Sequence, residues 1–340
     1  PENVKIYCLT STSSQKMKDY IRASLALQNL AQGMTDSSDV EEFLKIVVHH
    51  KGDFSDAKTM ALLGDRITSE ENESFANRVF YLAVPEDSVL NVAKVIKNSK
   101  SLYNGNGDGW TRLVLEKSSA RDTKTSASRA DELANLFEEK SLYRIDHYLG
   151  MEMVQNMLVM RFANSIFEPI WNRNHVAAVY VVSFSGNSLE QVNTSQQLAR
   201  CVTKNSQTYI NARKHRYFTF KETDLKGMKS DEDIIRDVIQ NHLLQVLSLV
   251  AMEAPSDIRK AESVTSEKVK LLDSIRVVRP EHVVLGQCGD EKEKAPTFAT
   301  VVLYVDNPRW SGVPFIIKAG RGMDQRKIDV RLQLKDAPGA

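Results

Sequence analysis

The sequence predicts an α/β domain followed by an α+β domain, and three observations lead to this fold class. A chain of 340 residues is long enough for about two domains, each with its own hydrophobic core. Residues 1–149 alternate short apolar runs with amphipathic segments, a pattern typical of parallel strands joined by helices. Residues 150–340 hold long helical segments and several strand-like runs separated by turn residues, which favours a mainly antiparallel sheet.

The elements of the first domain follow from the spacing of its apolar residues. The run Val79–Val84, closed by Pro85, is continuously apolar, as expected of a buried parallel strand. Residues 43–49 fit a strand or the end of a helix, and we favour the strand. The predicted strands are 3–10, 43–49, 79–84, 111–116 and 142–146. The predicted helices are 14–33, 55–67, 87–98 and 123–139.

The second domain is predicted to contain fewer helices and longer strands. Its two predicted helices cover 150–166 and 230–253, and the second of these is strongly apolar. Its predicted strands are 175–185, 283–287, 297–306, 313–318 and 327–335.

Composition excludes several classes of protein. The 45 Lys and Arg residues balance the 44 Asp and Glu residues, which excludes a uniformly basic nucleic-acid-binding protein. Cys8, Cys201 and Cys288 show no paired spacing, so we expect neither a disulfide framework nor a bound metal. The longest apolar runs, such as 176–184, are too short to span a membrane.

Two segments concentrate polar residues in positions suited to chemistry. Arg144–Gly150 lies where a strand is predicted to end, which is where α/β proteins bind ligands, although Asp146 could simply cap a helix. His242 lies in the apolar helix, where polar groups must be paired or line a cavity. A carboxylate such as Asp146 could orient its ring and make it a general base, and a satisfied core histidine is the alternative.

Several longer motifs occur along the chain, namely RVFYLAVP (78–85), YRIDHYLG (143–150), RFAN (161–164), IIRDVIQNHLLQ (234–245) and GVPFI (312–316). Taken together and in order, these motifs resemble those of the glucose-6-phosphate dehydrogenase family. The resemblance runs from near the first residue to about residue 336 and breaks mainly across 185–230, which we interpret as a divergent insertion. It implies a Rossmann-like coenzyme domain and an α+β domain. It also implies oxidation of the C1 hydroxyl of glucose 6-phosphate, with NADP as hydride acceptor.

The resemblance also implies a role for individual residues. His242 would take the proton of the C1 hydroxyl and Asp146 would orient it. The remaining predicted residues belong to substrate binding. They are His147 and Tyr148 at the phosphate, Lys117 between coenzyme and sugar, Asp237 at the sugar, and Arg321, which keeps a positive charge.

The sequence departs from the family pattern at several of its binding positions. The glycine-rich phosphate turn of the family lies before Pro1, and Thr10 stands where the family has an arginine for the 2′-phosphate, so no cofactor-binding residue is assigned. Met151 replaces a phosphate-binding lysine, and Gly186 replaces a sugar-binding carboxylate. Each lost charge-assisted contact costs about 1.5–3 kcal/mol. The chain also ends before the family's C-terminal part.

From these departures we expect a vestigial site that retains no cofactor, in a structural or assembly subunit of a larger protein complex. One alternative is an active, NADP-dependent glucose-6-phosphate dehydrogenase of the pentose phosphate pathway, represented by a partial chain. Another is a sugar-phosphate sensor without catalysis. The family implies the cytoplasm, and an organellar assembly such as a mitochondrial one is the alternative location.

The divergent insertion carries a local excess of positive charge. Residues 187–221 hold six basic residues against one acidic residue, Glu190, a net charge of +5. Aromatic residues interleave with the basic ones across 200–221, which suits RNA or an acidic partner. A solvated insertion whose aromatic residues pack on its own domain is the alternative.

Overall fold

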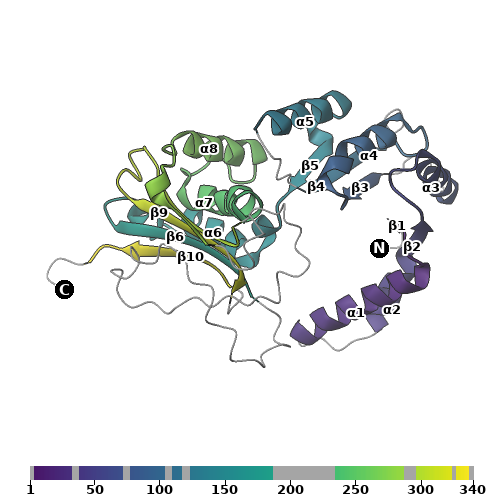
Figure 1. The fold of residues 1–340 in the computed structure, drawn as a ribbon, viewed down its shortest axis with the longest axis horizontal. Coiled ribbons are helices and arrows are strands. Elements are labelled where there is room, and N and C mark those ends of the chain that lie inside the picture. Colours follow the sequence, from purple (N-terminus) through teal and green to yellow (C-terminus); the bar gives the residue numbers. More distant parts are fainter. Residues whose placement is uncertain are drawn as a thin grey trace. The chain divides into compact units, whose positions relative to one another are not determined.

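A computed structural model describes residues 4–32, 38–71, 77–103, 109–116, 123–186, 234–286, 296–323 and 327–336 (Figure 1). The described residues before Ile145 form one compact unit, here called the N-terminal unit. Those from Ile145 onward form the second, here called the C-terminal unit. The predicted insertion at about 185–230, including 200–221, therefore lies almost entirely outside the described residues.

The N-terminal unit is built from parallel strands and amphipathic helices. β1 pairs with β2 in parallel, and β3 pairs with β4 in parallel, with β5 on the far side of β4. Its core centres on Ile96, Leu102 and Leu113, which are fully buried. The strands are β1 Ile6–Thr10, β2 Val47–Lys51, β3 Arg78–Leu82, β4 Thr111–Glu116 and β5 Leu142–Ile145. The helices are α1 Ser14–Gln32, α2 Ser38–Ile46, α3 Ala57–Glu70, α4 Glu86–Asn98, α5 Thr123–Leu136 and a 3₁₀ turn at Glu139–Ser141.

The strand predicted at 43–49 is wrong in its first half. Residues up to Ile46 belong to α2, and β2 begins only at Val47. Acidic Asp39 and Glu41 in the first turn and Lys45 in the last turn complement the dipole of α2. These charges favour helix up to the point where the β-branched pair Val47 and Val48 begins the strand.

The C-terminal unit is a five-stranded sheet with helices. Its strand order is β10-β6-β9-β8-β7, in which β6 and β9 run parallel and every other pair is antiparallel. The strands are β6 Val176–Gly186, β7 Val283–Gly286, β8 Phe298–Tyr304, β9 Pro314–Met323 and β10 Lys327–Leu334. The helical segments are α6 Glu152–Phe162, a π-type segment Ile235–Leu243, α7 Leu244–Ala251, α8 Ala261–Asp273, and 3₁₀ turns at His147–Gly150, Glu168–Ile170 and Pro280–His282. The helix α8 was not predicted from the sequence.

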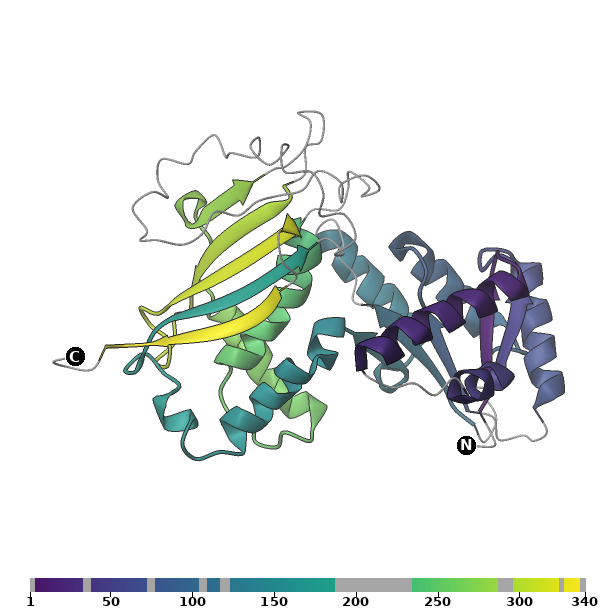
Figure 2. The ribbon, with the colours of Figure 1, turned by 90° about the horizontal axis from the view of Figure 1, so that it is seen from below.

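The helices of the C-terminal unit gather on one face of its sheet (Figure 2). Alternate residues of β9, such as Phe315, Ile317 and Ala319, are fully buried and belong to the same core cluster as residues of α6, α7 and α8. The period-two pattern of a strand explains why every second side chain reaches these helices. The helical segment before α7 contacts both β6 and β9, and α7 itself shares their core cluster.

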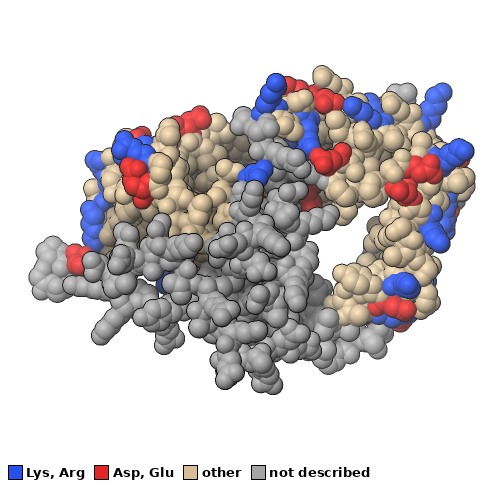
Figure 3. Space-filling view, viewed as in Figure 1, with Lys and Arg blue, Asp and Glu red and all other residues tan. Residues whose placement is uncertain are grey.

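The charged side chains on the described surface mix both signs, in keeping with the balanced composition (Figure 3). In the parts of the chain that the structure describes, no helix is long and apolar enough to cross a membrane.

Candidate active site

The helical segment from Ile234 to Ala251, here called the site helix, changes its hydrogen-bond pattern along its length. Its first part, Ile235–Leu243, is π-type: the N–H of Leu244 donates to the carbonyl of Ile239, five residues earlier. The second part is the α-helix α7. Within the described residues the helix predicted across 230–253 is present, with a π-type first part that was not predicted. Such π-type turns often occur at functional sites because they re-aim side chains.

The structure brings His242 and Asp146 together. Nδ1 of His242, on the site helix, lies 2.7 Å from Oδ1 of Asp146, which follows β5. The side chain of Asp146 is only 3% exposed, whereas that of His242 is 17% exposed. An ionised carboxylate can only accept hydrogen bonds, so in the neutral imidazole Nδ1 carries the proton and Nε2 keeps its lone pair. This arrangement leaves His242 able to accept a proton at Nε2.

Tyr148 supports this pair from two directions. Its backbone N–H donates to Oδ1 of Asp146 at 2.9 Å, and Asp146 thereby caps the short turn His147–Gly150. Its ring stacks on the imidazole of His242, with the centroids 4.3 Å apart and the planes 7° from parallel. Its hydroxyl shares a 2.7 Å hydrogen bond with Ser183 on β6. Ser183 is not among the residues predicted from the sequence, although a serine in the apolar run of β6 is a signal for such a partner.

Two further predicted substrate residues contact each other. A guanidinium nitrogen of Arg321, near the end of β9, forms an ion pair with the carboxylate of Asp237 on the site helix. The side chain of Arg321 is mostly buried, at 12% exposure, and that of Asp237 is 42% exposed. Because β6 and β9 are parallel, their carboxyl ends place Ser183 and Arg321 at the same edge of the sheet.

The residues predicted near the substrate phosphate differ in how far they are buried. His147 is exposed at the start of the 3₁₀ turn, next to the cap formed by Asp146. Met151, where the family has lysine, is partly buried and packs against the apolar core at the start of α6. Lys117 lies outside the described residues.

The described part of the N-terminal unit does not supply a complete site for a dinucleotide. β1 ends at Thr10, whose hydroxyl is hydrogen-bonded to Nε2 of His49 at 3.1 Å and to the hydroxyl of Thr12 at 3.0 Å. No glycine-rich turn joins a strand to a helix among the described residues of this unit. We therefore assign none of the described residues to the coenzyme. Within the described residues, no cluster of three His, Cys, Asp or Glu side chains could hold a metal ion.

Comparisons with known proteins agree on one family. Residues 1–156 match the family model described as glucose-6-phosphate dehydrogenase, NAD binding domain. Residues 230–340 match the model of the C-terminal domain of the same enzyme. The chain belongs to the glucose-6-phosphate dehydrogenase family.

Relatives and solved structures support this assignment. The chain is 37% identical to glucose-6-phosphate 1-dehydrogenase 5, cytoplasmic, of Arabidopsis thaliana, over all of this chain and 61% of the relative. It is 37% identical to the cytoplasmic isoform of Solanum tuberosum, over 98% of this chain and 60% of the relative. A structure of glucose-6-phosphate dehydrogenase in complex with its substrate has a TM-score of 0.76 and 29% identity, over 98% of this chain and 65% of that one. The chain thus spans about three fifths of the length of these two curated relatives.

The fold class predicted from the sequence is confirmed by these matches, with a Rossmann-like parallel-sheet domain followed by a domain with a mainly antiparallel sheet. The names of its members show that the family consists of oxidoreductases of glucose metabolism. The predicted roles of His242, Asp146, His147, Tyr148, Lys117, Asp237 and Arg321 stay predictions. The structure adds that Asp146 pairs with His242, and Asp237 with Arg321.

Proposed function

We propose that the protein is an active dehydrogenase that oxidises the C1 hydroxyl of glucose 6-phosphate with NADP as hydride acceptor. The observation that carries this proposal is the assembled pair of Asp146 and His242, with an imidazole that is oriented by a buried carboxylate. An imidazole oriented in this way can act as the general base of a proton transfer. The names of the relatives support the substrate, and the match of residues 1–156 to an NAD binding domain supports the coenzyme class.

The chain's own residues account for the proton half of the reaction. Oxidation of an alcohol to a lactone removes a proton from the hydroxyl oxygen and a hydride from C1. Nε2 of His242 takes the proton, and the Asp146 carboxylate stabilises the imidazolium that results. The stacked ring of Tyr148 holds the imidazole plane so that Nε2 keeps one direction. NADP, when bound, accepts the hydride.

The test is an assay of NADPH absorbance with the full chain, NADP, and either glucose 6-phosphate or glucose. We expect turnover with glucose 6-phosphate, a lower kcat/KM with glucose, and no turnover above background for His242→Asn. Absence of turnover by the folded wild-type protein would overturn the proposal.

A second candidate function, a subunit that keeps the fold without catalysis, is favoured by one observation. Met151 packs against the core where the family has a phosphate-binding lysine, and a thioether cannot pair with a phosphate dianion. The same assay separates the two functions, because this candidate predicts no NADPH at any concentration of substrate. We rank this candidate second because the contact between His242 and Asp146 is intact.

For the location we propose the cytoplasm, following the names of the two plant relatives above. Any binding of RNA or an acidic partner through 200–221 stays a prediction.

A further inference from the structure

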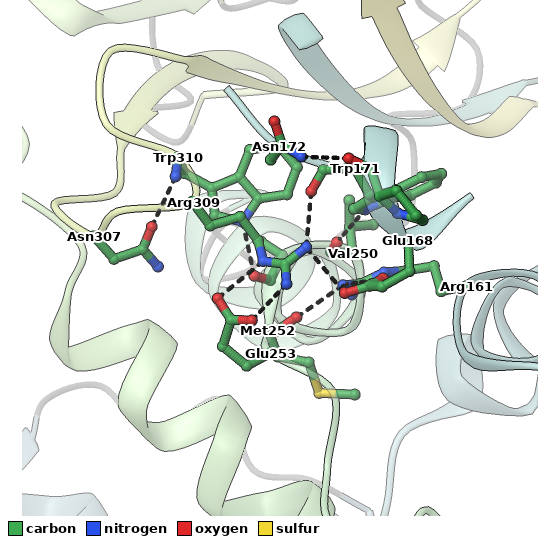
Figure 4. A network of polar contacts seen from close by, with 12 residues as sticks. Arg161, Glu168, Trp171, Asn172, Val250, Met252, Glu253, Asn307, Arg309 and Trp310 are labelled. Atoms are coloured by element: carbon green, nitrogen blue, oxygen red, sulfur yellow. Dashed lines mark hydrogen bonds and ion pairs between the residues drawn. The ribbon is translucent and has the colours of Figure 1, made fainter. Parts of the chain in front are cut away.

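The C-terminal end of α7 is held by three buried side chains from distant parts of the chain (Figure 4). An α-helix leaves its last four carbonyls without partners inside the helix. In α7 the cap N–H of Met252 donates to the carbonyl of Ser248, so the carbonyls of residues 249–252 need other donors. Each of the four receives a hydrogen bond from a side chain.

Arg161 on α6 supplies two of these hydrogen bonds. Its Nη1 donates to the carbonyl of Leu249 at 2.7 Å, and its Nη2 donates to the carbonyl of Met252 at 2.9 Å. The side chain is 0% exposed. The planar guanidinium fits this role because its nitrogens diverge at a fixed angle, and its charge complements the negative end of the helix dipole.

Two tryptophans supply the other two. Nε1 of Trp171 donates to the carbonyl of Val250 at 2.8 Å, and Nε1 of Trp310 donates to the carbonyl of Ala251 at 2.8 Å. Trp310 is fully buried, and its ring meets that of Phe315 edge-on with centroids 5.2 Å apart. The indoles therefore fix the helix end both by hydrogen bonding and by packing.

The buried charge of Arg161 is balanced by a small ionic network. Nη2 of Arg161 lies 3.2 Å from Oε2 of Glu168, and Arg309 contacts Glu168 at 2.9 Å and Glu253 at 2.5 Å. Burial lowers the pKa of Arg161 to about 10, and the charge of Glu168 opposes that effect. Arg161 is therefore still a cation at neutral pH, where it can donate to the helix end.

We infer that Arg161, Trp171 and Trp310 are positioning residues for His242. The inference rests on the proposed function. The site helix runs without a break from the π-type segment that carries His242 into α7, so fixing its end fixes its rotation and its axial position. Asp146 lies on a separate element, and a slip of one residue would turn His242 by about 100° away from it.

Distance excludes a direct role for this cap in the chemistry. Leu249 lies seven residues beyond His242, and a rise of about 1.5 Å per residue separates them by roughly 10 Å along the helix. Arg161 contacts the helix end beyond that point, so its effect on the reaction must pass through the helix. A loss at the cap should then lower kcat and leave the KM for glucose 6-phosphate unchanged.

The test compares Arg161→Lys and Trp310→Phe with the matched control Leu271→Ala in the full chain. Lysine keeps the charge but places all its donors on one atom, and phenylalanine keeps the ring but removes the N–H. Leu271 is a buried α8 residue of the same core cluster that none of the cap hydrogen bonds uses, so its truncation lowers stability without changing them. The readouts are kcat, KM and the nitrogen-15 shifts of the His242 imidazole, assigned with His242→Asn.

We expect Arg161→Lys to lower kcat roughly a hundredfold, with KM within about twofold of wild type. Trp310→Phe should lower kcat less, and Leu271→Ala should keep the wild-type kcat at a temperature where it is folded. The nitrogen-15 shifts should report one tautomer in wild type and Leu271→Ala, and a mixture in both cap variants. Unchanged shifts in both cap variants, or a tautomer mixture in wild type, would overturn the inference. A wild type without turnover but with these shifts would instead contradict the proposed function alone.

Discussion

Nδ1 of His242 lies 2.7 Å from Oδ1 of Asp146, although 96 residues separate them in the sequence. Asp146 directly follows β5, at the start of the C-terminal unit. His242 lies on the site helix, which packs against the sheet of that unit. A contact between two such distant elements exists only when the whole unit is folded. The pair is therefore a direct link between the fold and the proposed reaction.

Asp146→Asn should remove most of the activity while leaving the fold intact. An amide of the same shape can donate as well as accept, so it no longer holds the imidazole in the tautomer with Nε2 unprotonated. We expect kcat to fall about 10²–10⁴-fold. Steady-state kinetics checks this, with Asp306→Asn as the control because Asp306 is an exposed carboxylate that pairs with Arg276. Equal losses in both variants would contradict a specific role for Asp146.

Met151→Lys should tighten binding of the phosphorylated substrate. The new ammonium would stand where the family has its phosphate-binding lysine, and one charge-assisted contact is worth about tenfold in affinity. The KM for glucose 6-phosphate should fall by about that factor, and the KM for glucose should not change. Met153→Lys adds the same charge two residues further on, at an exposed position of α6, and should have no effect. If Met151→Lys lowered the KM for glucose by a similar factor, residue 151 would not contact the substrate phosphate.

The ion pair between Arg321 and Asp237 should make these residues act as a unit. Removing either partner frees the other from its orientation, so Arg321→Gln and Asp237→Asn should each raise the KM for glucose 6-phosphate about tenfold. The double variant should be no worse than the more damaging single variant. A double-mutant cycle measures this, with the exposed pair Arg276 and Asp306 as control. Effects that multiply would show that the two residues act independently.

Acid should weaken the N-terminal unit through Glu70. Hydrogen bonds from Arg66, Lys5 and Tyr7 lower the pKa of Glu70 from 4.5 to about 2. Between these two values the unfolded chain binds the proton more strongly, so stability is lost as the pH falls through this window. Unfolding midpoints measured from pH 5 to 2 should therefore depend less on pH in Glu70→Gln. Tyr7→Phe, which removes one donor, should give a smaller change. An unchanged dependence in Glu70→Gln would contradict this origin.

The pairing of Asp146 with His242 could be predicted from the sequence because each residue needs a polar partner in its predicted surroundings. A carboxylate at a strand end and a histidine on an apolar helix each demanded a partner, and the structure joins them. The π-type segment was not predictable, because the spacing of its apolar residues in the sequence fits an α-helix equally well. The helix α8 was not predictable either, because Leu271 is its one buried residue and its apolar face is correspondingly weak.

The cap of the site helix could not be predicted for a different reason. Arg161, Trp171 and Trp310 lie in segments that match the family. The identity of these residues does not predict which backbone carbonyls accept their hydrogen bonds. Those partners are backbone atoms of residues 249–252, and backbone acceptors leave no trace in the sequence. Only the assembled structure shows the contact.

The proposed reaction moves hydride from C1 of glucose 6-phosphate to NADP. The most direct measurement uses glucose 6-phosphate deuterated at C1 and follows the label in the reduced coenzyme by mass spectrometry. The account predicts that wild-type protein transfers the deuterium to NADP and that His242→Asn does not. Unlabelled coenzyme after incubation with the folded wild-type protein would contradict it.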